Sequence, residues 1–189
     1  VSRICETVGL VKSSLPSTAT LIGFCGGPWT VASYMVEGGS SDRVVARTAA
    51  YAGTDWFIAL IQRLVEESVA YLSAQIVAGA EVVQIFDSWA GELPGELAER
   101  YVIGPLSQMV KALKQLHPEV PIIVFGRGLG VRQVALADSC GSGAVGIETE
   151  LPMAWAAKNI GAGVVVQGNL DPVALLAPEN VLRGEVDRL

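Results

Sequence analysis

The sequence is poor in the residues that build metal centres and disulfide frameworks. Its 189 residues include one histidine, His117, and three cysteines, Cys5, Cys25 and Cys140. An odd number of cysteines without metal-like spacing indicates reduced thiols rather than paired disulfides. A zinc site made from His and Cys ligands is therefore poorly supplied.

Long apolar runs and an excess of positive charge are also missing. No apolar stretch reaches the roughly 18–20 residues that cross a bilayer, and the first residues lack the basic-then-apolar pattern of a signal peptide. Thirteen Lys and Arg stand against 19 Asp and Glu, and this net charge of −6 argues against nucleic acid and anionic membranes as partners. We therefore expect a soluble, intracellular protein, whose local arginines still allow a small anionic substrate.

Apolar residues dominate instead, at 51% against 17% charged residues, which excludes disorder and gives enough material for one core. Five short runs rich in β-branched residues recur between helical patterns. Because each run is continuous rather than alternating, we predict strands covered on both faces. The predicted strands are Thr20–Phe24, Glu81–Phe86, Pro121–Phe125, Ala144–Glu148 and Gly163–Gln167.

Helical spacing fills the intervals between these runs. The clearest stripe covers residues 54–78, where Thr54 or Asp55 is expected to cap the start and Gly79 to end the helix. Further helices are predicted over residues 1–15, 96–116, 131–139 and 152–160. The alternating order predicts an α/β chain with a parallel sheet, for which a doubly wound sheet and a (β/α)₈ barrel both fit. A whole barrel needs eight strands in about 250 residues, so the chain is interpreted as the middle of a larger domain.

Polar and aromatic side chains follow the predicted strands, at the positions where such folds carry their sites. Arg127 lies in a glycine-rich turn whose backbone N–H groups suit an anion; a substrate contact and a solvated or salt-bridged arginine are equally compatible. Glu148 and Asp171 are candidates either for acid–base chemistry or for fixing loops through backbone N–H groups. Residues 141–146 match the dinucleotide-binding pattern by letters but precede a strand, so we exclude that site.

Five runs together carry a resemblance: LIGFCGGPWT, ASYMVEGG, QIFDSWAG, PIIVFG and QGNLDP. They resemble the uroporphyrinogen decarboxylase family, in order and across nearly the whole chain. The resemblance implies that residues 1–189 form part of one (β/α)₈ barrel, about strands three to seven. It also implies a cytoplasmic, homodimeric enzyme of haem biosynthesis that needs no metal or cofactor. Its tetrapyrrole substrate, uroporphyrinogen III, loses its acetate carboxyl groups as CO₂ to give coproporphyrinogen III.

The same resemblance assigns four residues to substrate binding. Tyr34 and Ser88 match hydroxyl groups that meet substrate carboxylates, while Phe24 and Phe86 match aromatics that line the cleft; Arg127 is a further candidate. The catalytic arginines and aspartate of the family, and its histidine in a Gly-His-Gly turn, have no counterpart in this chain. We therefore expect the isolated chain to be inactive. The sequence departs from the family at residues 148–149, where Glu-Thr replaces the common Asp-Trp.

Two other functions stay open at this point. One is a cobalamin- or thiol-linked methyltransferase of the same barrel superfamily, which would hold zinc with His and Cys ligands. The other is a truncated, non-catalytic chain that binds a tetrapyrrole weakly. Ser88 is not expected to be a nucleophile, because no Gly-x-Ser-x-Gly elbow surrounds it, and Asp87 is the better candidate to cap the segment that follows. Cys25 is interpreted as a small buried thiol.

Overall fold

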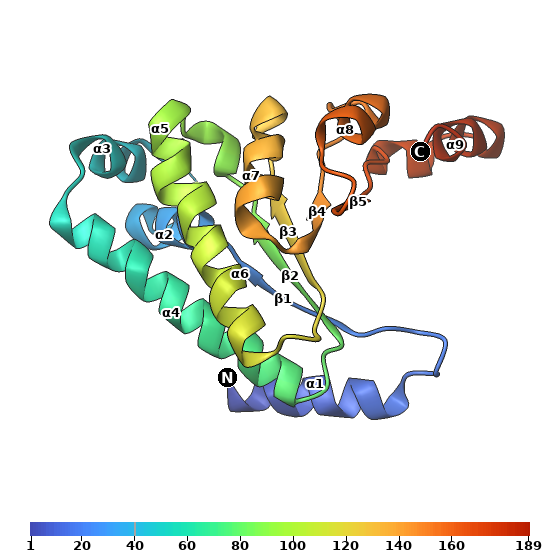
Figure 1. Cartoon of the computed structure of the whole chain (residues 1–189), viewed down its shortest axis with the longest axis horizontal. Helices are drawn as coiled ribbons and strands as arrows, with labels where there is room; N and C mark the ends of the chain where they lie inside the picture. The colour runs from blue at the N-terminus through green and yellow to red at the C-terminus, as the bar shows by residue number, and fades with distance from the viewer. Residues whose placement is uncertain (40) are drawn as a thin grey trace.

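A computed structural model describes residues 1–39 and 41–189 of the chain. Its centre is a five-stranded sheet in the order β1-β2-β3-β4-β5, in which all neighbouring strands are parallel (Figure 1). The strands are β1 Ile22–Gly26, β2 Val82–Asp87, β3 Ile122–Gly126, β4 Gly143–Gly146 and β5 Val165–Gln167. The predicted α/β chain with a parallel sheet is confirmed.

The five strands fall at the predicted runs, with shifted ends. The first strand runs two residues further than expected, because Gly26 still pairs with Phe86 and the backbone N–H of Gly27 then donates to the Phe86 carbonyl. The fourth strand ends at Gly146 rather than at residue 148. Pairing with the neighbouring strand, which sequence patterns do not report, decides where each strand begins and ends.

Helices and short helical turns connect the strands. The long helix α4 matches the expected range, and Gly79 follows it with a positive φ of 119°. Thr54 takes the N-cap position of α4, but its side chain makes no capping hydrogen bond, so this detail of the prediction is wrong. The helices are α1 Ser2–Ser14, α2 Pro28–Glu37, α3 Val44–Ala52, α4 Asp55–Val77, α5 Gly95–Ala98, α6 Gly104–Leu116, α7 Gln133–Cys140, α8 Met153–Asn159 and α9 Glu179–Val186, with turns η1 Ala90–Glu92, η2 Glu99–Ile103, η3 Gly130–Arg132 and η4 Pro172–Leu176.

The helix expected over residues 96–116 is interrupted by η2, which has π-helical geometry. The Gly104 N–H donates to the carbonyl of Glu99, five residues earlier. Pro105 follows directly, and a proline inside a helix lacks an N–H and clashes with the carbonyl four residues before it. The local widening of the helix is therefore explained by Pro105.

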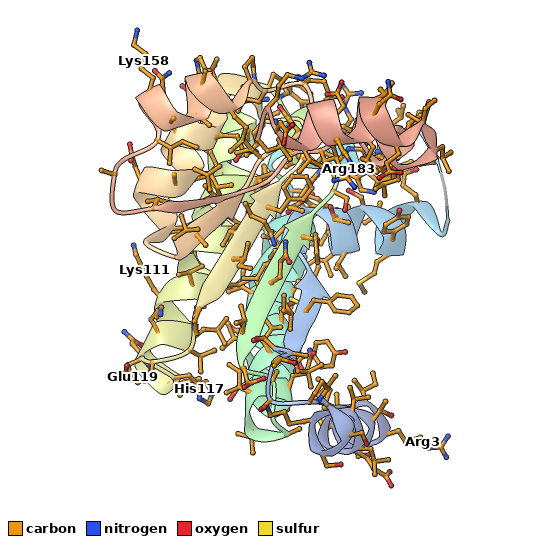
Figure 2. The ribbon with its side chains drawn as sticks, turned by 90° about the vertical axis from the view of Figure 1, so that its right-hand side faces the viewer. Arg3, Lys111, His117, Glu119, Lys158 and Arg183 are labelled. Atoms are coloured by element: carbon orange, nitrogen blue, oxygen red, sulfur yellow. The ribbon has the colours of Figure 1, made fainter. Side chains whose placement is uncertain are left out.

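Helices α4 and α6 pack against one face of the sheet, as Figure 1 shows. Side chains alternate across a strand, and those of Val83, Ile85 and Val124 point to this face and are fully buried. On the opposite face Ile22 is 41% and Phe24 60% exposed; Figure 2 views the sheet from this side. The prediction of strands covered on both faces is therefore wrong for β1.

In the part of the chain that the structure describes, no helix combines the length and the apolar character that crossing a bilayer requires.

Candidate functional site at the carboxyl ends of the strands

The loop after β1 and the loop after β2 are joined by side-chain hydrogen bonds. Thr30, in the first turn of α2, donates from its hydroxyl to Asp87 Oδ1 over 2.6 Å and accepts from the Trp89 N–H over 3.1 Å. The indole N–H of Trp29 donates to the carbonyl of Trp89 over 3.0 Å. All three hydrogen bonds are part-buried or buried, so they fix α2 relative to the end of β2.

Asp87 is the most unusual titratable group of this region. It is fully buried, and among the described residues its Oδ2 has no hydrogen-bond partner. Burial raises the pKa of its carboxyl to about 7, although the hydrogen bond from Thr30 and nearby backbone N–H groups act in the opposite direction. Asp87 is expected to cap the segment that follows; its carboxylate accepts the hydroxyl of Thr30 on a different element, and the Trp89 N–H is among the backbone donors that lower its pKa.

This raised pKa predicts a pH dependence of stability. Asp87 has a higher pKa in the folded protein than in the unfolded chain, so its stabilisation is complete below about pH 4 and is lost as the pH rises through about 7. The shift corresponds to an upper limit of about 4 kcal/mol. We expect Asp87→Asn to flatten the change in the free energy of unfolding between pH 5 and 8, measured by chemical denaturation. The control Asp138→Asn, at an exposed position, should keep the wild-type slope; equal slopes in both variants would contradict the assignment.

The structure brings Tyr34 and Ser88 to the same end of the sheet. Tyr34 lies on α2, is 48% exposed, and places its ring edge-on to Trp89 with centroids 6.3 Å apart. Ser88 is half-buried between Asp87 and Trp89. Ser88 lines a cavity of about 180 Å³, whereas Tyr34 lies beside this cavity and is not part of its lining.

The small cavity is formed by the loops after β2 and β3. A larger cavity, of about 570 Å³, lies between the loops after β4 and β5 and the last residues of the chain, and it contains none of the predicted binding residues. We take the smaller cavity as the candidate site, because two of the predicted binding residues, Ser88 and Arg127, line it. Its lining consists of Ser88, Trp89, Gly91, Glu92, Arg127 and Gly128.

Three aromatic rings form a row on the open face of the sheet, below the strand ends. Phe24 contacts Phe86 edge-to-face with centroids 6.1 Å apart, and Phe86 contacts Phe125 in the same way at 6.3 Å. Gly146 makes room for this row, because a Cβ at that position would lie 2.9 Å from the Phe125 ring. The predicted cleft aromatics Phe24 and Phe86 are thus placed side by side in an apolar surface that leads to the polar loops.

Arg43 holds the segment before α3 against the loop after β2. Its guanidinium lies 3.9 Å from the centroid of the Trp89 ring and forms a hydrogen bond and an ion pair with Glu92. The two charged side chains are only 16% and 24% exposed. Because Glu92 is neutralised by this partner, it does not add a free negative charge to the cavity that it lines.

Glu148 and Asp171 both fix loops, so this interpretation is confirmed over acid–base chemistry. Glu148 accepts the backbone N–H of Gly130 over 2.9 Å and also that of Gly128. Asp171 accepts the N–H of Val173 over 2.9 Å. The anion expected in the turn around Arg127 is therefore supplied by the chain itself.

The potential metal ligands of the chain are far apart. His117 ends α6, where it pairs with Ser73 over 2.7 Å at the end of the sheet where the strands begin (Figure 2). Burial raises the pKa of the Cys25 and Cys140 thiols to about 12, so neither offers a ready thiolate. Within residues 1–39 and 41–189, no three His, Cys, Asp or Glu side chains are grouped to hold a metal ion. The zinc set that a methyltransferase would need is not found among these residues.

Sequence reasoning missed four residues that organise the site: Trp29, Thr30, Arg43 and Asn169. Asn169 donates from its amide to the carbonyl of Glu148 over 2.9 Å. Three of the four lie inside the motifs quoted for the resemblance, yet their partners are 18 to 60 residues away along the chain. No local pattern identifies such partners.

Comparison with known proteins gives a consistent result. The sequence model described as uroporphyrinogen decarboxylase (URO-D) matches residues 1–189. The chain belongs to the uroporphyrinogen decarboxylase family. The uroporphyrinogen decarboxylase of Rhodospirillum rubrum is 45% identical over 185 residues, which cover 97% of this chain and 53% of that protein. That of Jannaschia sp. is 39% identical over 190 residues, which cover 100% of this chain and 55% of that protein.

The chain therefore spans about half the length of these uroporphyrinogen decarboxylases. The family membership predicted from the five motifs is confirmed. The assignment of Tyr34, Ser88, Phe24, Phe86 and Arg127 to substrate binding stays a prediction, to which the geometry adds a cavity and an aromatic row.

Proposed function

We propose that these residues form part of a uroporphyrinogen decarboxylase, which converts uroporphyrinogen III into coproporphyrinogen III by releasing four acetate carboxyl groups as CO₂. The observation that carries the proposal is the match to this family over residues 1–189. Since the relatives are about twice as long, the activity is proposed for these residues together with the remaining half of such a protein.

The five strands are proposed to be strands three to seven of a (β/α)₈ barrel. Helices α4 and α6 pack on one face only, and the opposite face carries exposed Phe24, as expected for a surface that the closed barrel turns inward. In the described sheet, β1 and β5 each have one unpaired outer edge. The neighbouring strands of the barrel would pair with these edges. Following the family resemblance, we further propose a cytoplasmic homodimer.

The substrate is proposed to lie with its macrocycle over the aromatic row and its carboxylates toward the polar loops. A tetrapyrrole combines an apolar body with a charged periphery, and the phenylalanine row beside the Ser88 cavity offers both environments. In this placement the hydroxyls of Ser88 and Tyr34 donate to carboxylates, and Arg127 adds a charge-assisted contact.

The reaction needs an electron sink rather than a redox step. Protonation of a pyrrole ring carbon creates a cation, into which the electron pair of the breaking C–CO₂ bond flows as CO₂ leaves. Protonation of the exocyclic carbon then completes the methyl group, and loss of the proton first added to the ring carbon restores the pyrrole. The contribution proposed for this chain is to bind carboxylates and orient one acetate arm, which lowers the barrier by positioning. The groups that donate the proton and stabilise the cation are assigned to the other half of the enzyme.

Binding of uroporphyrin, the oxidised tetrapyrrole with eight carboxylates, tests the proposed contacts. We expect Ser88→Ala and Tyr34→Phe each to raise the Kd about tenfold, because each removes one hydrogen bond to a charged group. The Kd is measured by titration with tryptophan fluorescence as the signal.

Matched controls exist at positions outside the cavity lining. Ser73→Ala removes a hydroxyl that pairs with His117 at the opposite end of the sheet, and Tyr51→Phe removes one on the exposed face of α3. Both controls should keep the wild-type Kd. If Ser88→Ala and Tyr34→Phe bind uroporphyrin as tightly as these controls, the proposed binding residues are wrong.

A further inference from the structure

The turn after β3 has a backbone shape that gathers N–H groups. Gly128 and Gly130 have φ values of 79° and 56°, in the left-handed region, while Leu129 between them is right-handed with φ −70° and ψ −21°. Alternation of these two conformations turns successive N–H groups toward one side, which creates an anion-binding concavity. The side chain of Arg127 projects from the start of this turn.

The carboxylate of Glu148 occupies this concavity. One oxygen accepts the N–H of Gly130 over 2.9 Å, and the other accepts the N–H of Gly128. Glu148 itself is anchored, since its backbone carbonyl accepts the amide of Asn169 over 2.9 Å. The turn is therefore tied to the end of β4 and, through Asn169, to the loop after β5.

The opposite side of the turn is held by the loop after β2. The Arg127 N–H donates to the carbonyl of Asp87 over 3.1 Å, and the Arg127 carbonyl accepts the Gly91 N–H over 2.8 Å. With Glu148 on one side and these bonds on the other, the backbone that carries Arg127 is fixed beside Ser88. Both residues line the same cavity of about 180 Å³.

Among the described residues that line this cavity, Arg127 carries the one charge without an ion-pair partner, although the chain as a whole is acidic. Arg127 is exposed, and none of the ion pairs found among residues 1–39 and 41–189 includes it. Glu92, the carboxylate in the cavity lining, is paired with Arg43. The carboxylate of Glu148 already accepts the N–H groups of Gly128 and Gly130. The guanidinium of Arg127 is therefore the group that remains to receive an incoming carboxylate.

We propose that Glu148 is a positioning residue, which locks the turn at residues 126–130 so that Arg127 receives a substrate carboxylate beside Ser88. This proposal rests on the proposed function insofar as the cavity takes a carboxylate of the tetrapyrrole. Glu148 itself does not touch the substrate and acts through Arg127. Replacement by glutamine keeps the shape but turns one of two acceptors into a donor that faces an N–H group.

The experiment is a double-mutant cycle with uroporphyrin as the probe. We expect Arg127→Ala to raise the Kd about tenfold and Glu148→Gln to raise it about fivefold. In the Arg127→Ala background, Glu148→Gln should add less than about a twofold change. Glu148→Asp, which keeps the charge on a shorter side chain, should give an intermediate Kd and serves as the second variant if Glu148→Gln does not fold.

Hydrogen–deuterium exchange supplies an independent readout on the same proteins. The amides of Gly128 and Gly130 should exchange about tenfold faster in Glu148→Gln than in wild type, because they lose a charged acceptor. The control Glu150→Gln, an exposed neighbour whose carboxylate accepts the hydroxyl of Thr149 and no other donor among the described residues, should change neither exchange nor Kd.

The outcomes separate this inference from the proposed function. Faster exchange with an unchanged Kd would show a purely structural role for Glu148 and overturn the inference. An effect of Glu148→Gln that persists undiminished without the Arg127 side chain would also overturn it. If Ser88→Ala and Arg127→Ala both leave the Kd unchanged, the carboxylate site itself is wrong, whereas faster exchange would still show that Glu148 fixes the turn.

Discussion

The 189-residue polypeptide, purified alone, is expected to decarboxylate uroporphyrinogen at least about 10³-fold more slowly than a full-length relative. Removal of one preorganised charge-stabilising group typically costs about 10²–10³ in rate, and the family resemblance places several such groups outside the matched residues. The described sheet also has unpaired outer edges at β1 and β5, where the proposed barrel would place its remaining strands.

The measurement is product analysis after anaerobic incubation with uroporphyrinogen III, with the Rhodospirillum rubrum enzyme as the reference. Intact mass should confirm the 189 residues, and circular dichroism should confirm a folded sample. Stepwise loss of carboxyl groups at a rate within tenfold of the reference would show that the matched half carries the catalytic groups. Binding of uroporphyrin without turnover would instead support a substrate-binding part of the enzyme.

Among single methyl additions at the site, Gly91→Ala should lower the free energy of unfolding the most. A Cβ on Gly91 would lie 2.3–2.6 Å from the carbonyl oxygen, carbon and Cα of Gly128, all of them backbone atoms that cannot rotate away. The loops after β2 and β3 must then separate, and the hydrogen bond from the Gly91 N–H to Arg127 is strained or lost. We expect the free energy of unfolding to fall by about 3 kcal/mol, and the Kd for uroporphyrin to rise with it.

Gly161→Ala is the matched control. Gly161 is exposed, and a Cβ there would meet nothing within 4 Å. Its free energy of unfolding, measured by urea denaturation, should stay within about 0.5 kcal/mol of wild type. A Gly91→Ala variant as stable as this control would mean that the two loops do not approach as closely as the structure describes.

The parallel sheet was predictable because each strand is a short apolar run and each connection contains a helical stripe. The helices that the sequence pattern does not predict show the limit of this approach. Helix α2 begins at Pro28, shortly after β1, and ends at Glu37, where Gly38 caps it with a φ of 71°. Both are recognised helix-boundary signals, but no helix is among those predicted between residues 24 and 54.

The location of the candidate site was predictable from the sequence, but the hydrogen bonds between its loops were less so. Tyr34, Ser88 and Arg127 were singled out from motifs and do gather where strands end. The hydrogen bonds that fix the surrounding loops were not predicted. Thr30 and Asp87 are 57 residues apart along the chain, and Glu148 and Gly128 are 20 residues apart. Such pairs depend on strand order and register, which a single sequence does not contain.

The hydrogen bonds that join neighbouring loops also bear on how this family diverges. Trp29 and Thr30 link the first loop to the second, Gly91 links the second to the third, and Glu148 and Asn169 link the third to the fifth. Side chains on the outward faces of the helices do not join two loops in this way. Substitutions at these positions are therefore independent of one another. In these linked loops, a change in side-chain length such as Glu for Asp at residue 148 requires the turn that this side chain holds to move. We therefore expect substitutions in these linked loops to occur in sets, so that the loops of two relatives are best compared together.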